Sequence, residues 1–204
     1  MITLYGTNTS PFVRKVRIHL LEMGLAHNVV NTLDDAGQAE LRKVNPLWKI
    51  PAAVFDDGRT VFDSRVLLTL LWEGHRDAGV RAGLRPMGSG MERWDEENLL
   101  TVIDGVVDSA INRFYLLRDG LPETGYVVKQ RERVDAAMHW LAERLRGGSF
   151  LPDGSVGVPE ISLVCALDWL TFRAQYAWQG MDAFARFRDA HRARPSVAQT
   201  MPGT

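Results

Sequence analysis

The stretch Pro51-Ala-Ala-Val-Phe-Asp-Asp-Gly-Arg-Thr-Val-Phe62, PAAVFDDGRTVF, carries two short apolar runs separated by Asp56-Asp57-Gly58-Arg59. Asp-Gly between two such runs is a strong signal for a β-hairpin, because glycine supplies the positive φ that a tight turn needs. The segments on either side of this hairpin then decide which fold it belongs to.

Strand-like and helix-like segments alternate before the hairpin and resume after it. In chain order they are a strand at residues 2–5, a helix at 11–23 ended by Gly24, a strand at 27–31, a helix around 38–43 and, after the hairpin, a helix at 64–73. Apolar residues at helical spacing indicate the helices, and β-prone residues indicate the strands. The order βαβαββα over residues 1–75 predicts a thioredoxin-like α/β domain, in which the first two strands pair in parallel through a right-handed crossover.

A linker and an all-helical domain are predicted to follow. Residues 76–90 are rich in Gly and Arg and have no apolar period, which is typical of a linker. Residues 91–204 show helical spacing over about 94–117, 127–145 and 181–193, and Gly147 and Gly148 are expected to stop the second of these helices. A segment that begins near Pro159 is apolar nearly all round, which predicts a central buried helix.

Composition and charge exclude several classes of function. The 204 residues hold 24 basic and 25 acidic side chains, so no net field attracts nucleic acid or an anionic bilayer. No stretch approaches the roughly 18 consecutive apolar residues of a membrane span, and the first residues lack the basic start and apolar core of a signal peptide. We therefore expect a cytoplasmic protein with no nucleic-acid or membrane partner.

The single cysteine, Cys165, excludes a disulfide framework, a Cys-X-X-Cys redox pair and a multi-cysteine zinc site. It lies in the predicted buried helix, where a lone cysteine is more often a small core side chain than a nucleophile. The five histidines have no ligand spacing, and Gly88-Ser89-Gly90 follows no strand. We therefore expect neither a metal nor a dinucleotide.

Three junctions between predicted elements suit an anion or an extended backbone. Ser10, before Pro11, suits a helix cap, and the N–H groups of the same helix start would also stabilise a thiolate. Lys49-Ile50-Pro51 precedes the third strand, where the proline is either ordinary strand-start chemistry or a cis turn that offers the backbone of Ile50 to a peptide-like ligand. Asp63-Ser64 begins another helix, whose N–H groups could receive a carboxylate.

Two segments, TSPFVRKVRI (9–18) and NPLWKIPAAVFDDGRTVFDSRVL (45–67), together with the all-helical second half, resemble the cytosolic glutathione S-transferases. The resemblance covers essentially the whole chain and is greatest to bacterial members with a serine before Pro-Phe. It implies an N-terminal domain that binds glutathione, a helical domain that completes a pocket for an electrophile, and a homodimer.

The resemblance assigns each junction a part of the tripeptide. Ser10 would hydrogen-bond the glutathione sulfur, Lys49 would lie by the glycyl carboxylate, and Ile50, ahead of a cis proline, would pair its backbone with the cysteinyl part. Asp63 and Ser64 would hold the γ-glutamyl end, the carboxylate on its ammonium and the hydroxyl with the helix N–H groups on its carboxylate. Glutathione would be the co-substrate, and no metal would be needed, because thiolate attack requires only positioning and an apolar second pocket.

Two positions depart from the family pattern. Trp48 stands where related sequences often carry a small residue such as Gly, and its indole would either narrow the tripeptide site or stack at the dimer surface. The start of the buried helix, which in the family usually carries Ser or Thr followed three residues later by Asp, here carries Gly157 and Glu160. This pair keeps the geometry of a capping box with no side chain at the cap.

The electrophile pocket is expected to draw on Phe12 and on Arg113, Phe114, Tyr115 and Arg118 of the long helix. Phe114 could equally be a core residue and the arginines solvated. Since one helix face offers only some of its side chains to a pocket, the candidates are Phe12, Tyr115 and Arg118.

The leading hypothesis is a glutathione transferase that joins the glutathione thiolate to a small hydrophobic electrophile in detoxification, with Ser10 activating the thiol. Serine in place of cysteine disfavours a thiol-disulfide or dehydroascorbate reductase, because that reaction needs a mixed disulfide with the protein. A non-catalytic binding or regulatory protein of the same fold, such as those that attach to bacterial RNA polymerase, is a further alternative.

Overall fold

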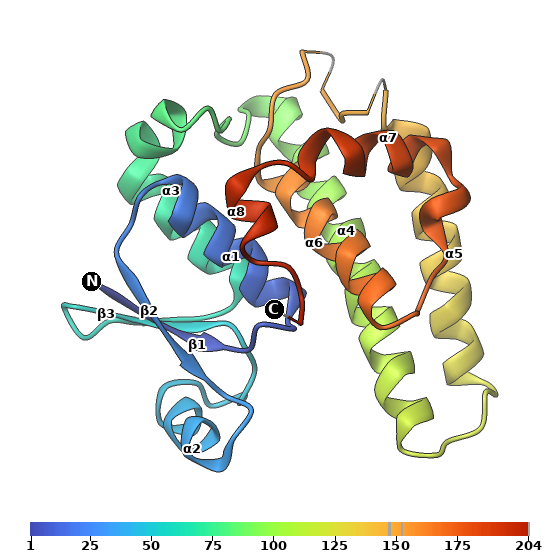
Figure 1. Cartoon of the computed structure of the whole chain (residues 1–204), viewed down its shortest axis with the longest axis horizontal. Helices are drawn as coiled ribbons and strands as arrows, with labels where there is room; N and C mark the ends of the chain where they lie inside the picture. The colour runs from blue at the N-terminus through green and yellow to red at the C-terminus, as the bar shows by residue number, and fades with distance from the viewer. Residues whose placement is uncertain (147, 152, 204) are drawn as a thin grey trace. The chain divides into compact units, whose positions relative to one another are not determined.

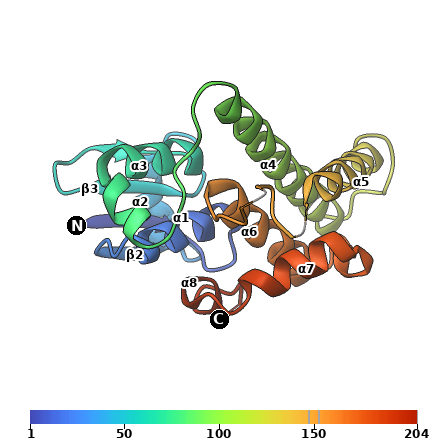
Figure 2. The ribbon, with the colours of Figure 1, turned by 90° about the horizontal axis from the view of Figure 1, so that it is seen from above.

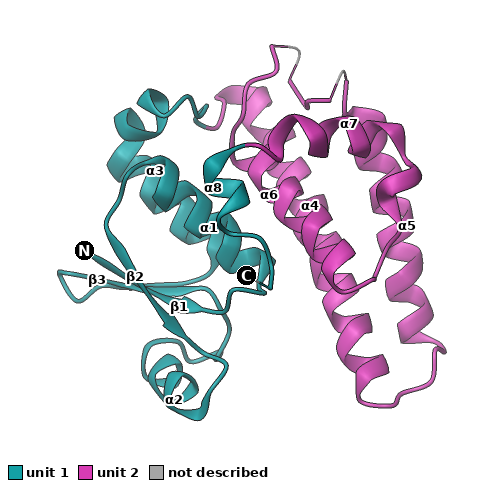
Figure 3. Ribbon diagram, viewed as in Figure 1, with its two compact units in different colours: residues 1–86, 194–204 teal, residues 87–193 magenta. Residues whose placement is uncertain are grey.

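Segments from both ends of the sequence share the first of the two units into which the chain divides (Figure 3). The structure, a computed structural model, describes residues 1–146, 148–151 and 153–203. Unit 1 comprises Met1–Pro86 and Arg194–Thr204, and unit 2 comprises Met87–Ala193. The predicted fold class is confirmed, because a thioredoxin-like sheet with its helices is followed by an all-helical region.

A four-stranded sheet forms the centre of unit 1. Its strands are β1 (Ile2–Gly6), β2 (His27–Asn31), β3 (Ala52–Phe55) and β4 (Thr60–Val61), in the order β2-β1-β3-β4. β2 pairs with β1 in parallel, whereas β3 is antiparallel to both β1 and β4. The predicted hairpin is confirmed: Phe55 N–H donates to the Arg59 carbonyl at 3.0 Å, and Gly58 has a φ of 80°.

Three helices cover the two faces of this sheet (Figure 1). α1 (Pro11–Glu22) and α3 (Ser64–Arg81) pack together on one face, and α2 (Asp35–Val44) covers the other. The end of β1 requires a glycine, because a Cβ on Gly6 would lie 2.4 Å from Cγ2 of Val13. This close approach lets α1 lie directly over the end of β1.

α3 is longer than the sequence predicts, and it takes in part of the expected linker at 76–90. The helix kinks at His75, where φ is −135°, and then continues to Arg81. Gly79 lies in the continued part, where a Cβ would lie 2.7 Å from the ring of Trp72, so the backbone packs closely on the buried indole.

The last residues of the chain lie against α1, although the sequence groups them with the helical domain. α8 (Pro195–Ala198) contacts α1, and the Arg194 guanidinium donates to Glu22 at 2.7 Å. The buried Arg14 donates from Nε to Thr200 Oγ1 at 3.2 Å and from Nη2 to the Val197 carbonyl at 3.0 Å. Because these contacts join residues more than 170 positions apart, helical periodicity alone does not predict them.

The named elements in the described part of unit 2 are all helices (Figures 1 and 2). They are α4 (Gly90–Arg118), α5 (Tyr126–Arg144), α6 (Val158–Phe172), the short 3₁₀ helix η1 (Trp178–Gly180) and α7 (Asp182–His191). Every residue of α6 from Val158 to Leu170 is buried, including Cys165, and Glu160 accepts from the Gly157 N–H at 2.9 Å as a capping box requires. Gly147, predicted to help stop the second helix, lies outside the described residues.

His19, in the middle of α1, is a fully buried titratable group. Its Nδ1–H donates to the Lys15 carbonyl at 2.8 Å, and Nε2 has no partner among the described residues. Burial lowers the pKa of His19 to about 4; Lys15 and Arg194 also lower the pKa, whereas the carbonyl hydrogen bond and Glu22 raise it. The folded protein therefore holds the neutral imidazole at a pH at which the unfolded chain binds a proton.

We predict that acid destabilises the protein through His19. The neutral His19 contributes fully to the free energy of unfolding above the unfolded pKa of 6.5. This contribution is lost as the pH falls from 6.5 towards 4, because only the unfolded state takes up the proton in that window. The free energy of unfolding should fall by roughly 2 kcal/mol between pH 7 and pH 5 from this group. Urea denaturation of the wild type and of His19→Gln at several pH values measures the difference, and parallel pH profiles would refute the assignment.

Candidate functional site

The three predicted junctions meet at one edge of the sheet in unit 1. β1 is antiparallel to β3, with Tyr5 opposite Ala52, and β3 is antiparallel to β4, with Ala53 opposite Val61. The end of β1, the start of β3 and the end of β4 therefore lie at the same edge. Ser10, Pro51 and Ser64 follow or precede these strand ends by a few residues, so the topology brings all three junctions together.

Ser10 is the N-cap of α1, as the sequence predicts. Its φ and ψ of −80° and 123° are extended, and its Oγ accepts from the Val13 N–H at 3.3 Å. The cap uses Oγ as an acceptor, so the hydroxyl proton stays available to donate to a ligand. The same side chain can thus cap the helix and donate a hydrogen bond outward.

Hydrogen bonds to the side chain of Asn45 hold the loop before β3. The buried Asn45 donates to the Lys49 carbonyl at 2.7 Å and accepts from the Leu47 N–H at 2.9 Å. The Ile50–Pro51 peptide bond is cis, and the pairing of the Ile50 backbone with a ligand stays a prediction. Within the described residues, Ile50 takes part in none of the backbone hydrogen bonds outside helices and strands, and the exposed Lys49 has no carboxylate partner.

Asp63 and Ser64 begin α3. Asp63 is the N-cap, and its Oδ1 accepts from the N–H groups of Arg65 at 2.9 Å and Val66 at 3.4 Å. This bonding leaves Oδ2 for another cation or donor, because the cap hydrogen bonds use one oxygen only. Ser64 is the first residue of the helix and is buried, and none of the hydrogen bonds of the described residues uses its hydroxyl.

The electrostatics of this edge suit a ligand that carries charge of both signs. α1 and α3 both begin here, and each helix start has a partial positive charge and N–H groups without intrahelical acceptors. Lys49 adds a formal positive charge, and Asp63 supplies a carboxylate. Two anionic groups and one cationic group of an extended molecule could each find a partner here.

Trp48 lies beside this edge on the surface of α2. Its φ of 56° is in the left-handed region, which accounts for the small residue that related sequences often carry there. The indole is 57% exposed, and the Arg42 guanidinium lies 4.5 Å from its ring centroid. The ring is therefore held on α2 by a cation–π contact.

The three candidates for an electrophile pocket do not share a unit. Phe12 belongs to α1 in unit 1, where the Lys15 ammonium lies 5.3 Å from its ring centroid. Tyr115 and Arg118 lie together on α4 in unit 2, with the guanidinium 4.6 Å from the phenol ring centroid, and both are exposed. Their role in a pocket stays a prediction.

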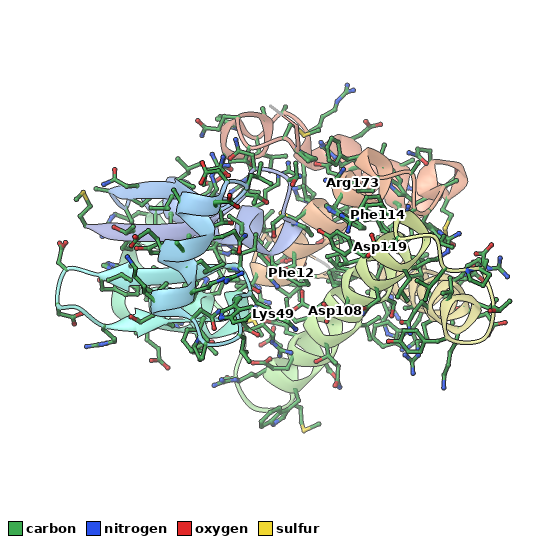
Figure 4. All side chains as sticks on the ribbon, turned by 90° about the horizontal axis from the view of Figure 1, so that it is seen from below. Phe12, Lys49, Asp108, Phe114, Asp119 and Arg173 are labelled. Carbon is green, nitrogen blue, oxygen red and sulfur yellow. The ribbon has the colours of Figure 1, made fainter. Side chains whose placement is uncertain are left out.

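Arg173 is a cationic side chain that the sequence analysis missed. It follows α6 directly, and its guanidinium lies 5.0 Å from the ring centroid of Phe114 on α4 (Figure 4). The sequence shows only that an arginine follows an apolar helix. The contact between Arg173 and Phe114 arises from the packing of α4 on α6, which the sequence does not show.

Two absences hold for the described parts of the chain. No group of three or more His, Cys, Asp or Glu side chains among them could hold a metal ion. None of the described helices has the combined length and apolar character that a membrane span needs.

Comparison with known proteins identifies the relatives of this chain. Residues 4–79 match the family model described as glutathione S-transferase, N-terminal domain. One similar solved structure is that of a glutathione transferase family member from Pseudomonas fluorescens Pf-5 with bound glutathione. The two sequences are 29% identical, the TM-score is 0.82, and the match covers 100% of each chain. A glutathione S-transferase from Methylobacterium radiotolerans, in complex with glutathione sulfonate, is 25% identical with a TM-score of 0.87 over 100% of this chain and 95% of that one.

Residues 4–79 thus match the N-terminal domain of the glutathione S-transferase family, and over its whole length the chain has the fold of solved glutathione S-transferases. Among curated proteins, the chain is 27% identical over 172 residues to the uncharacterized GST-like protein YibF of Escherichia coli K12. The match covers 83% of this chain and 82% of YibF. The match to the N-terminal domain of glutathione S-transferases contains all three junctions at the sheet edge.

We predict that Asp63 stabilises α3 by capping it. Asp63→Ala should lower the free energy of unfolding by about 1 kcal/mol, whereas Asp63→Asn should cost less than half of that, because Asn caps a helix nearly as well as Asp. Urea denaturation measures both, with Glu73→Ala on the exposed face of α3 as the control. Equal losses for the Ala and Asn variants would show that the charge of Asp63, rather than its cap geometry, stabilises the helix.

Proposed function

We propose that this protein is a glutathione transferase, in which Ser10 activates the glutathione thiol for attack on a small hydrophobic electrophile. The observation that carries the proposal is the hydroxyl of Ser10, which caps α1 as an acceptor and keeps its proton for a ligand at the sheet edge. Glutathione-bound structures of relatives support the identity of that ligand.

Each group of glutathione would meet a partner of matching chemistry at this edge. The glycyl carboxylate would lie by Lys49, and the cysteinyl backbone would pair with Ile50, ahead of Pro51. The γ-glutamyl ammonium would meet the carboxylate of Asp63, and its carboxylate would meet the hydroxyl of Ser64 and the N–H groups of α3.

The thiol would then be activated without a base. A free thiol has a pKa near 8.5, so only a few per cent is thiolate at neutral pH. A hydrogen bond from Ser10 and the positive end of α1 both favour the thiolate, and lowering the pKa by about two units would make it the main form. The sulfur would attack the electrophilic carbon directly, and the leaving group would depart with its electron pair.

The proposal also includes a cellular compartment, an assembly state and a role for the reaction. We place the enzyme in the cytoplasm as a homodimer that removes reactive electrophiles, with the helical unit completing the electrophile pocket. Disulfide reduction is disfavoured, because position 10 holds no cysteine and Cys165 is buried in α6.

We predict that Ser10→Ala leaves glutathione bound but impairs its activation. The pKa of the bound thiol, followed by thiolate absorbance, should rise by roughly one unit, because the thiolate loses one hydrogen bond. Conjugation of 1-chloro-2,4-dinitrobenzene at neutral pH should fall by about threefold in kcat/KM, because the thiolate fraction falls from about three quarters to about one quarter. An unchanged thiol pKa would mean that Ser10 serves only as a cap.

A matched control separates capping from catalysis. Asp34 is the N-cap of α2, and its Oδ1 accepts from the Gly37 N–H at 2.7 Å. Asp34→Ala and Ser10→Ala should each cost about 1 kcal/mol of folding stability, but only the second should alter the thiol pKa.

The proposal as a whole is tested by glutathione binding and product formation. Wild-type protein should bind immobilised glutathione and conjugate at least one member of a panel of aryl halides, epoxides and unsaturated carbonyls. Disulfide exchange that is faster than conjugation would favour a reductase, and binding without turnover of any electrophile would favour a regulatory protein. A protein that ignores glutathione would refute the proposal.

A further inference from the structure

A cluster of aromatic rings surrounds one arginine in unit 2. We call it the Arg173 cluster, and its members are Phe114 and Tyr115 of α4, Trp169 and Phe172 of α6, and Arg173. The ring centroid of Phe114 lies 5.3 Å from that of Tyr115 and 6.3 Å from that of Trp169. Tyr115 and Phe172 are 47% and 40% exposed, so the cluster presents aromatic surface to a ligand while Trp169 is buried beneath it.

Arg173 differs from its neighbours because it has no acidic partner. The guanidiniums of Arg113 and Arg118 contact Glu123 at 2.9 Å and Asp119 at 2.8 Å. The guanidinium of Arg173 instead lies 5.0 and 4.6 Å from the ring centroids of Phe114 and Phe172, and no carboxylate of the described residues pairs with it. Rings bind the face of a guanidinium, whereas its five N–H groups lie in its plane and stay available to a carboxylate.

The backbone holds Arg173 in a defined place. α6 ends in a Schellman motif: Ala174 N–H donates to Thr171 at 3.0 Å and Gln175 N–H donates to Leu170 at 2.8 Å, with Ala174 at a φ of 51°. The Gln175 side chain then donates to the Arg173 carbonyl at 2.8 Å and accepts from Arg113 of α4 at 3.1 Å. The turn that carries Arg173 is therefore tied to the helix that carries Phe114.

The charge around the cluster favours an anion. Glu123 accepts from both Arg113 and Arg131, at 2.9 and 3.2 Å, and Asp119 pairs with Arg118. Three arginines thus pair with two acids, and Arg173, which contacts neither acid, brings the excess to two positive charges.

From these contacts we infer that the Arg173 cluster binds an aromatic carboxylate, with the carboxylate on the edge of the guanidinium and the ring against Phe114, Tyr115 or Phe172. A planar carboxylate matches the guanidinium fork, and offset or edge contacts between rings hold the rest of the molecule. This inference rests on the proposed function in one respect: the aromatic carboxylate would be the electrophile, and Arg173 would determine its specificity.

A pair of substrates that differ only in charge tests the assignment. In 4-chloro-3-nitrobenzoate the glutathione thiolate forms a C–S bond at the carbon that bears chlorine, and the C–Cl bond breaks with loss of chloride; the thiol proton passes to solvent. The amide, 4-chloro-3-nitrobenzamide, reacts in the same way but carries no carboxylate.

We predict that Arg173→Gln lowers kcat/KM for the benzoate by about tenfold and changes that for the benzamide by less than about twofold, since one charge-assisted contact is lost. Arg173→Lys should keep part of the preference, because it keeps the charge but not the planar fork. Arg144→Gln is the control, because Arg144 also stacks on a ring near a helix end, 3.4 Å from the centroid of Trp140, but is exposed and, among the described residues, contacts one ring only. An equal loss in both Gln variants, or an unchanged ratio of the two substrates in Arg173→Gln, would overturn the inference.

Binding without reaction separates this inference from the proposed function. Calorimetric titration with 4-methyl-3-nitrobenzoate, which has no leaving group, should give at least about tenfold tighter binding than 4-methyl-3-nitrobenzamide, and Arg173→Gln should abolish the difference. If the wild type conjugates neither chloro compound but shows this difference, the transferase proposal fails and the carboxylate site stands. If it does not distinguish the two methyl compounds, the site is refuted whatever the enzyme conjugates.

Discussion

The antiparallel register of β1 against β3 is the constraint on which the candidate site depends. With Tyr5 opposite Ala52, the residues that follow β1 and those that precede β3 are placed at the same edge, and β4 brings Asp63 and Ser64 to it. Because side chains alternate between the faces of a sheet, a slip of one residue would reverse which side chains are buried and move the three junctions apart. β1 shows this alternation, because Ile2, Leu4 and Gly6 are buried whereas Thr3 and Tyr5 are only partly buried.

The same edge shows how folding and ligand binding can use different atoms of the same residues. Helices need acceptors for their first N–H groups, and Ser10 and Asp63 supply them with one oxygen each. The hydroxyl proton of Ser10 and the second carboxylate oxygen of Asp63 are not needed by the caps. A helix start is therefore a suitable place to build a binding site without a loss of stability.

Local features of the sequence were sufficient to predict the strands, the hairpin and the three junctions. Each depends on residues within a few positions of one another, such as Asp57-Gly58 in the turn or Ser10-Pro11 at the helix start. The continuation of α3 beyond His75 was not predicted, because residues 76–90 have no apolar period. The position of residues 194–203 and the Arg173 cluster were not predicted, because each depends on a contact between distant residues. Arg14 with Thr200 and Phe114 with Arg173 are pairings that only the tertiary structure brings about.

The return of the C-terminal segment to α1 has a consequence for synthesis of the chain on the ribosome. Arg14 and Glu22 are made early, but their hydrogen-bond partners at 194–200 are made more than 170 residues later. A buried guanidinium without acceptors is costly, so α1 cannot reach its final packing before these partners have been made. The first unit must therefore wait for the synthesis of the whole second unit before it is complete.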